Sequence, residues 1–399
     1  MKTDKHILVL TYWSFNDALI QTYTLPYLKI IADILSEDSK LYLYTLENKK
    51  THPHSLTKKI SNITGLYYPF GLKAIIFWLI NFFKLYIFIK KNKINYIHCW
   101  CTPAGAAGYV LSKLTGAKLI LDSYEPHAEA MVENGEWTKN SISFKLLFWL
   151  EKLQSKRASV VIATTIGMKE YAFKKYYADL TNFYVKPACV SLTNFSIMNR
   201  KNIDLVKSMN YENKIVCVYA GKFGGIYLKD EVFEFYKIAY DFWKDKFRIL
   251  ILTNQSNIEL IELAYKYSIP LEIMTIKFVK HSEIANYIGL GDFAICPVKP
   301  VPTKKFCTPI KNGEYWALGL PVIIPSSISD DSEIIEKTGN GFVFKELNKM
   351  EYLKSIYYIQ EYYEKYSSEE IFLKNRTLAE KYRNYSIAEE VYRKIYFSN

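Results

Sequence analysis

The chain has 399 residues, which is enough for two domains of ordinary size. Half of the residues are hydrophobic and 23% are charged, and the formal net charge is +12. This composition is typical of a soluble globular protein, and the positive charge indicates an anionic partner: a phosphorylated ligand, an acidic membrane surface or nucleic acid. The sequence has no basic run interleaved with aromatic residues and no helix-turn-helix or zinc-finger spacing, so nucleic acid is disfavoured.

The cysteines indicate a reduced environment. Six of them stand at positions 99, 101, 189, 217, 296 and 307, without a CxxC pair. Cys217 and Cys296 lie in apolar runs, where cysteine packs as a small hydrophobic side chain. The start, "MKTDKHILVLTYW", leads directly into a strand pattern and does not read as a signal peptide. We therefore expect a cytoplasmic protein with free thiols.

The first half of the chain alternates between strand-like and helix-like runs. Short apolar strands are predicted at 6–13, 40–47, 95–100, 117–125 and 159–165. Helices are predicted after residue 16 and at 72–91, 105–116, 144–158 and 167–177. Short buried strands separated by helices indicate a parallel sheet built from βαβ units.

The stretch 72–93, "LKAIIFWLINFFKLYIFIKKNK", is strongly apolar and ends in a cluster of lysines. Lys73, Asn81 and Lys84 interrupt it, and its apolar part falls short of the roughly 20 residues that a membrane span needs. One interpretation is a buried helix that packs on the sheet. The other is a helix that rests its outer aromatic face on an anionic bilayer, with the lysines at the headgroups.

The second half repeats the alternation after a polar segment. Strands are predicted at 215–221, 247–254, 271–279, 292–298 and 320–325, and the end of the chain is helical. We expect an N-terminal domain at 1–195, a linker at 196–214, a second domain at 215–380 and a C-terminal helix at 381–399. In two doubly wound domains, ligands bind outside the carboxyl ends of the strands, here in a cleft between the domains.

Three segments of the second domain resemble, in order and spacing, the family 4 retaining glycosyltransferases. "VCVYAG" is followed by Lys222 and Lys229, "GLGDFAICPVKP" resembles a strand of that family, and "PIKNGEYWALGLPVI" resembles its "K..EymA.G.PVi" block. Together they cover roughly 215–345, and the first domain matches more weakly. The resemblance implies an α/β architecture of the GT-B type, with two Rossmann-like, doubly wound domains facing a central cleft. It also implies no cofactor and no metal ion.

The residues of the first segment suit a diphosphate. When the diphosphate of a nucleotide sugar departs, it gains negative charge, which fixed cations and helix N-terminal amides stabilise. Lys222 and Lys229 would supply the cations. Gly221 lies at the end of the strand, and the following pair, Gly224 and Gly225, lets the backbone approach the phosphate closely.

The third segment suits the rest of the nucleotide. Pro309 is expected to be the first residue of a helix, with Thr308 as its N-cap and free amides following at Ile310 and Lys311. By the resemblance, Glu314 accepts hydrogen bonds from the ribose hydroxyls. A carboxylate that accepts two neighbouring hydroxyl groups is a natural clamp for ribose.

One position departs from the family pattern. Many members carry a second glutamate eight residues before the ribose glutamate, and it contacts the transferred sugar. Phe306 stands at that position here. The donor-sugar contacts are therefore not carried over, and the backbone around 307–310 together with Lys311 is expected to take their place.

A polar cluster, "DSYEPHAE", follows a predicted strand of the first domain. The family often has an acidic residue after a histidine there. Glu125 matches the acidic residue, Tyr124 replaces the histidine, and His127 follows two residues later. Glu125 and His127 would orient sugar hydroxyls, although hydrogen-bonded helix-cap residues are the alternative interpretation. His98 fits equally well as a satisfied core histidine or as a cleft residue.

These features predict a retaining, metal-independent glycosyltransferase with a nucleotide sugar as donor. The acceptor would be a glycan or a polyprenyl-linked saccharide in cell-surface polysaccharide synthesis, and the enzyme would be cytoplasmic, with peripheral contact to the inner face of the membrane. Two rivals are a sugar-nucleotide epimerase of the same fold and a non-catalytic partner subunit. An epimerase needs carboxylates that abstract a carbon-bound proton, and the second domain has no clear set.

Overall fold

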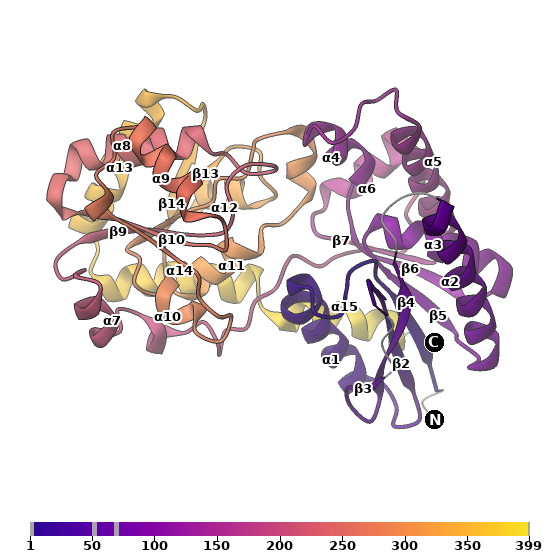
Figure 1. Ribbon diagram of the computed structural model, residues 1–399. Coiled ribbons are helices and arrows are strands. Elements are labelled where there is room, and N and C mark those ends of the chain that lie inside the picture. Colours follow the sequence, from indigo (N-terminus) through magenta and orange to yellow (C-terminus); the bar gives the residue numbers. More distant parts are fainter. Residues whose placement is uncertain (1–3, 50–53, 68–71, 398–399) are drawn as a thin grey trace. The chain divides into compact units, whose positions relative to one another are not determined.

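The computed structural model describes residues 4–49, 54–67 and 72–397, which form two compact units (Figure 1). Unit 1 comprises Met1–Lys186 and Ser386–Asn399, and unit 2 comprises Pro187–Tyr385. The expected boundaries at 195 and 381 therefore lie inside unit 2. The reason is pairing within that unit: the amide of Val190 donates to the carbonyl of Arg383 at 2.8 Å.

In the described part of unit 1, eight strands form one sheet in the order β3-β4-β2-β1-β5-β6-β7-β8. All neighbours pair in parallel except β3 with β4. The strands are β1 (His6–Leu10), β2 (Lys40–Glu47), β3 (His54–Ser55), β4 (Ile60–Leu66), β5 (Tyr96–Trp100), β6 (Lys118–Tyr124), β7 (Val160–Ala163) and β8 (Phe183–Val185).

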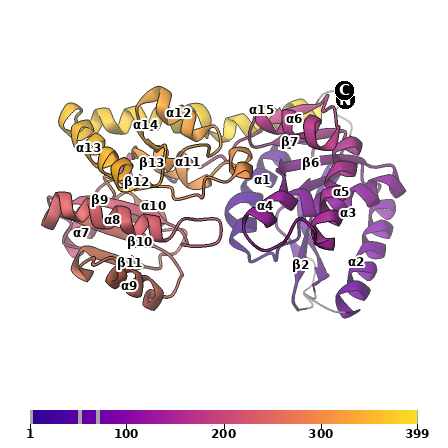
Figure 2. The same cartoon turned by 90° about the horizontal axis from the view of Figure 1, so that it is seen from above.

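Helices connect these parallel strands, as βαβ units require. They are α1 (Leu25–Ile34), α2 (Leu72–Lys91), α3 (Thr102–Thr115), α4 (His127–Glu133), α5 (Ile142–Arg157) and α6 (Gly167–Tyr171), with single π-helical turns at Ile20–Thr24 and Ala172–Tyr176. The last helix of the chain, α15 (Tyr385–Phe397), returns to unit 1. Figure 2 shows α15 beside the elements of unit 1.

Unit 2 has a parallel sheet of six strands in the order β11-β10-β9-β12-β13-β14 within the described residues. The strands are β9 (Ile215–Ala220), β10 (Phe247–Leu252), β11 (Met274–Lys277), β12 (Phe293–Ile295), β13 (Val322–Pro325) and β14 (Gly341–Phe344). The helices are α7 (Ile203–Ser208), α8 (Asp230–Trp243), α9 (Asn257–Lys266), α10 (Ile284–Ile288), α11 (Ile310–Ala317), α12 (Asp331–Thr338), α13 (Lys349–Lys365) and α14 (Ser368–Tyr382), with 3₁₀ turns at Ile197–Asn199, Lys244–Lys246, Leu271–Ile273 and Pro302–Phe306.

The sheet of unit 2 is buried on both faces. Along β9, Val216 and Val218 belong to one hydrophobic cluster, and Cys217 and Tyr219 belong to the other. This alternation follows from the period of two along a strand, and two buried faces explain why the strand sequence is apolar throughout. Packing thus covers both faces of the sheet, and a ligand can bind at the carboxyl ends of its strands.

The segment 196–214 is not a linker but part of unit 2. The side chain of Arg200 donates to the carbonyls of Gly289 and Gly291 at 3.1 and 2.6 Å. Lys201 lies 2.8 Å from a carboxylate oxygen of Asp292. These contacts explain why a polar sequence is ordered here: its cations bind carbonyls and a carboxylate at the end of α10.

Candidate active site

A glycine turn follows β9 in unit 2. Gly224 and Gly225 have φ angles of +84° and +60°, a region that side chains with a Cβ rarely adopt. Phe223 and Gln255 hold the turn through two hydrogen bonds: the amide of Phe223 donates to Gln255 Oε1 at 2.7 Å, and Gln255 Nε2 donates to the carbonyl of Phe223 at 3.1 Å. The glycine pair thus forms a turn after the carboxyl end of a central strand, and its approach to a phosphate stays a prediction.

The start of α11 differs from the prediction. The helix begins at Ile310, and Pro309 is its N-cap, with no hydrogen bond from a side chain. Thr308 precedes the N-cap; it is buried, and its hydroxyl lies 3.1 Å from that of Ser329. Pro309 has no side-chain oxygen with which to cap the first amides of α11. The N-terminus of a helix favours an anion.

The carboxyl end of β9 and α11 come together at Gly221. A Cβ on Gly221 would lie 2.9 Å from Cε of Lys311 and 2.6 Å from the hydroxyl of Tyr219. The amide of Ala220, the last residue of β9, donates to the hydroxyl of Tyr315 at 3.0 Å. Glycine is therefore required at this position because two side chains occupy the space that a Cβ would need.

Glu314 lies one helical turn after Lys311 and is half-buried. Burial raises the pKa of Glu314 to about 6, although the positive charge of Lys311 opposes this rise. A carboxylate with a raised pKa beside a lysine is typical of functional sites, but structural ion pairs show it too. The structure brings Lys311, Glu314 and Gly221 together; their functional roles stay predictions.

The two lysines after β9 have different surroundings. Lys222 is exposed, and no ion pair involves it within the described residues. Lys229 Nζ lies 3.5 Å from a carboxylate oxygen of Glu259, on α9. A diphosphate at Lys229 would therefore compete with Glu259, a partner that the sequence analysis missed because it lies 30 residues further along the chain.

Phe306, in place of the family's second glutamate, is buried. It ends the 3₁₀ turn Pro302–Phe306, and Nζ of Lys305 lies 4.9 Å from the centre of its ring. The turn therefore has a basic and aromatic character where the family has an acidic residue.

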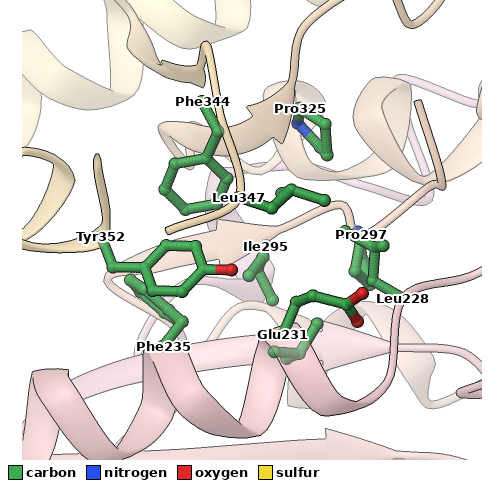
Figure 3. Close-up of a pocket in the computed structure, with 10 residues that line it drawn as sticks. Leu228, Glu231, Phe235, Ile295, Pro297, Pro325, Phe344, Leu347 and Tyr352 are labelled. Atoms are coloured by element: carbon green, nitrogen blue, oxygen red, sulfur yellow. The ribbon is translucent and has the colours of Figure 1, made fainter. Parts of the chain in front are cut away.

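A small pocket in unit 2 is a separate feature. It lies at the ends of β12, β13 and β14, and the hydroxyl of Tyr352 and the carboxylate of Glu231 point toward it (Figure 3). Its volume is about 10 Å³, which is room for one water molecule at most. The pocket is too small for a nucleotide and is not the candidate site.

In unit 1, Glu125 directly follows β6, and His127 is the first residue of α4. His127 Nδ1 is 4.0 Å from a carboxylate oxygen of Glu125, and both side chains are partly exposed. Burial raises the pKa of the Tyr12 hydroxyl, and the nearby Cys101 and Glu125 raise it further. Because Tyr12, Cys101 and Glu125 follow β1, β5 and β6, they gather at one edge of the sheet.

Glu151 is a carboxylate in this region that the sequence analysis missed. It is buried on α5 and accepts hydrogen bonds from the amide of Ala128 at 2.9 Å and from the hydroxyl of Tyr176 at 2.8 Å. Burial raises the pKa of Glu151 to about 7, and these two hydrogen bonds oppose the rise. Glu151 fixes the start of α4 and therefore the position of His127, the first residue of that helix.

His98 is a core residue. It is fully buried; Nε2 lies 3.0 Å from Asp122 Oδ2, and Nδ1 lies 2.7 Å from the hydroxyl of Tyr396. Asp122 also lies 3.2 Å from Nζ of the buried Lys186 and accepts a hydrogen bond from Tyr392 at 2.8 Å. The cluster joins the last residue of unit 1 before the crossing, Lys186, to the returning helix α15.

The interpretation of 72–93 as a buried helix fits only in part, and contact of this helix with a bilayer stays a prediction. Asn81, Leu85 and Ile89 are buried, but much of the outer side of α2 is apolar and exposed. Across residues 4–49, 54–67 and 72–397, no helix combines the length and apolar character that crossing a bilayer requires.

Two Rossmann-like units, each with a parallel sheet connected by helices, define the GT-B fold of glycosyltransferases. One similar solved structure is the sucrose-phosphate synthase of Thermosynechococcus elongatus, with a TM-score of 0.73, 13% identity and coverage of 99% of this chain and 100% of that chain. A glycosyltransferase from Rickettsia africae has a TM-score of 0.69, 17% identity and 99% coverage of both chains.

A third similar structure is Anabaena HepE in complex with UDP-glucose, with a TM-score of 0.72, 13% identity and coverage of 98% of this chain and 100% of that chain. At these identities the likeness shows the fold. No model of a known protein family matches the sequence, and no curated protein matches it.

Proposed function

We propose that the chain is a retaining glycosyltransferase, which moves a sugar from a nucleotide sugar to a glycan or lipid-linked saccharide without a metal ion or cofactor. The reaction would serve cell-surface polysaccharide synthesis at the cytoplasmic side of the membrane. The observation that carries the proposal is the meeting of the carboxyl end of β9 and α11, where Lys311 packs over Gly221. The GT-B fold supports it, since HepE, a structure of the same fold, was solved with UDP-glucose.

The chemistry would be mainly electrostatic. The bond between the sugar C1 and the diphosphate oxygen breaks, and Lys222 together with the first amides of α11 stabilises the departing charge. The acceptor oxygen bonds to C1 on the same face, and its proton passes to the departing diphosphate. No side chain needs to act as a nucleophile in this scheme. Glu314 would hold the ribose.

A thermal-shift screen with nucleotide sugars tests the donor. Binding to the folded state stabilises it by about 2.7 kcal/mol when the ligand is at a hundred times its Kd, so at least one nucleotide sugar should raise Tm. The absence of a shift with every common nucleotide sugar would contradict the proposal. Incubation of the best donor without acceptor then separates the rivals: an epimerase forms a new sugar isomer, and a non-catalytic subunit gives neither transfer nor slow hydrolysis.

The affinity for the nucleotide sugar should depend on pH through Glu314. Because its pKa is about 6, lowering the pH from 7.5 to 5 protonates the carboxylate and removes an acceptor for the ribose hydroxyls. If binding requires the ionised form, affinity falls about tenfold for each pH unit below the pKa. The diphosphate of a nucleotide sugar does not titrate in this range. Calorimetry across the range measures the effect.

The matched variant is Glu314→Gln, which keeps the size of the side chain and cannot ionise. Its affinity should be lower at pH 7.5 and flat between pH 7.5 and 5. The same pH dependence in this variant and in the wild type would show that another group titrates, and the ribose role of Glu314 would be wrong.

A further inference from the structure

The outer side of α2 presents a row of apolar side chains to solvent. The row repeats with the helical period, and its members are between 38% and 63% exposed: Ile76, Leu79, Ile80, Phe83 and Ile87. Trp78 adds a further ring that is 55% exposed. In a soluble monomer, contiguous apolar side chains of this size usually mark a binding surface.

A second apolar row lies on α5. Ile142, Leu146 and Trp149 are spaced four and three residues apart, and their exposed fractions are 83%, 53% and 54%. This spacing places them on one side of the helix. The opposite side carries Glu151 and Gln154, which are fully buried. α5 therefore resembles α2 in that a row of apolar residues faces outward, to solvent.

The two helices belong to one surface, because α3 lies between them and contacts both (Figures 1 and 2). Lys90 of α2 donates to the carbonyl of Thr115 on α3 at 3.3 Å. Arg157 of α5 donates to the hydroxyl of Ser112 on α3 at 3.2 Å. We call the outer sides of α2, α3 and α5 the three-helix face.

The charge on the three-helix face has one sign. From residue 76 of α2 onward, the three helices contain eight basic residues: Lys84, Lys90, Lys91, Lys113, Lys145, Lys152, Lys156 and Arg157. They contain one acidic residue, Glu151, which is buried. Several of the cations lie in the last turns of the helices, where they also interact favourably with the negative end of the helix dipole. Basic residues therefore border the apolar rows, without an exposed carboxylate on these helices.

We propose that the three-helix face binds the surface of an anionic lipid bilayer, with the apolar rows of α2 and α5 at the acyl boundary and the lysines at the headgroups. A bilayer offers both partners at once: apolar depth for Phe83 and Trp149, and negative charge for the lysines. A soluble acidic glycan would satisfy the lysines but leave the apolar rows in water.

The placement also suits the proposed reaction. Helices between parallel strands run antiparallel to them, so the first turns of α2 and α5 lie at the carboxyl edge of the sheet. Ile142 is in the first turn of α5, and Ile76 directly follows the first turn of α2. Glu125 and His127, at the end of β6 and the start of α4, lie at the same edge. Bilayer contact there would bring a lipid-linked acceptor to unit 1. This last step rests on the proposed function; bilayer binding does not.

Vesicle flotation with the full chain tests the proposal. At low salt the wild type should float with vesicles that contain phosphatidylglycerol and remain behind with pure phosphatidylcholine. The double variant Phe83→Ser/Trp149→Ser should bind at least tenfold more weakly. A matched control is Ile258→Ser/Tyr265→Ser on α9, where the side chains are 70% and 67% exposed, and its binding should be unchanged.

The charges are tested separately. Neutralising Lys91 and Lys156 to glutamine should weaken binding roughly fivefold for each lysine, and added salt should reduce that difference. Lys244→Gln/Lys337→Gln in unit 2, where the lysines are 65% and 77% exposed, is the control. Removal of Trp149 alone should weaken binding, because α5 takes part; an effect confined to α2 variants would overturn the three-helix face.

Two outcomes overturn the proposal: wild-type chain that does not float with anionic vesicles, and a Phe83→Ser/Trp149→Ser variant that floats like the wild type. Sedimentation velocity without lipid adds a third. If the wild-type chain forms a dimer but does not bind vesicles, and the Phe83→Ser/Trp149→Ser substitutions dissociate that dimer, the face is a contact between copies of the chain. Thermal shift with nucleotide sugars reports on unit 2 alone, so failure of the donor prediction and failure of bilayer binding are distinguishable.

Discussion

Replacing Lys222 by alanine is expected to lower the rate of sugar transfer by about a hundredfold or more. Lys222 follows the strand that ends at Gly221, it is exposed, and no acidic side chain in the described chain pairs with it. Loss of one donor that stabilises charge in a transition state typically costs a factor of 10² to 10³ in rate. An exposed substitution changes the free energy of unfolding by at most about 0.5 kcal/mol, so stability should remain. Transfer kinetics and thermal unfolding of the same samples measure both.

Two controls sharpen this result. Lys222→Arg keeps the charge and should retain part of the activity. Lys337→Ala, which removes an exposed lysine on α12, should behave like the wild type.

Lys229→Ala should also abolish transfer, and the ion pair of Lys229 with Glu259 adds a test. Glu259→Gln frees the ammonium of Lys229 and should tighten nucleotide binding. Near-wild-type activity of Lys222→Ala would remove the assignment of the phosphate contact.

Most of the sheet could be predicted because its strands are apolar on both faces. The strands that sequence reasoning missed are those without such a run. β4 reads "ISNITGL", and its buried Asn62 accepts a hydrogen bond from the hydroxyl of Thr45 at 3.3 Å. β8 reads "FYV" and β14 reads "GFVF", and neither was predicted. Pairing with neighbouring strands makes them part of the sheets, and such pairing is a property of the fold.

In the candidate site, too, some features could be predicted from the sequence and others could not. The sequence indicated an unusual backbone at Gly224 and Gly225, because glycine readily adopts φ angles that other residues rarely adopt. The partners of the predicted residues could not be predicted. The hydroxyl of Ser329 forms a hydrogen bond with that of Thr308, and Glu259 forms an ion pair with Lys229. Each partner stands more than 20 residues away in a segment without a motif. A family pattern gives the position of a side chain in the sequence, but not the groups that surround it after folding.

The segment at 72–93 is a third case. Its apolar composition fitted either a buried helix or a helix on a bilayer surface, and composition alone does not say which side of the helix faces the sheet. The side that packs inward carries Asn81, whose amide donates to the carbonyl of Leu66 at 2.7 Å. The polar residue thus faces inward, where a backbone group satisfies it, and Phe83 faces outward. A structure was needed to reveal this inversion.

Breaking the charge pair between Asp122 and Lys186 is expected to destabilise unit 1 by about 3–5 kcal/mol. Both side chains are fully buried, and the lysine also lies 3.8 Å from the centre of the Tyr27 ring. Asp122→Asn leaves the ammonium of Lys186 buried without a counter-charge, which is more costly than the pair itself. Since the two units need not unfold together, amide hydrogen exchange of β6 and α15 is the appropriate measurement.

The double variant Asp122→Asn/Lys186→Met isolates the pair. Methionine has no charge to desolvate, so the double variant should lose clearly less stability than the sum of the two single variants. Additive losses would mean that the two side chains do not interact, and the cluster would then not fasten α15 to the sheet.

The same carboxylate gives a dependence on pH. Burial alone would raise the pKa of Asp122, but Lys186 and His98 hold it at about 2, below its ordinary value of 3.8. A carboxyl group with a lowered pKa in the folded state stabilises that state above 3.8, and the stabilisation is lost as the pH falls toward 2. Exchange in α15 should therefore accelerate below pH 3.8 in the wild type relative to Asp122→Asn. The variant has no carboxylate to protonate there, so an equal acceleration in both proteins would assign the acid sensitivity to other groups.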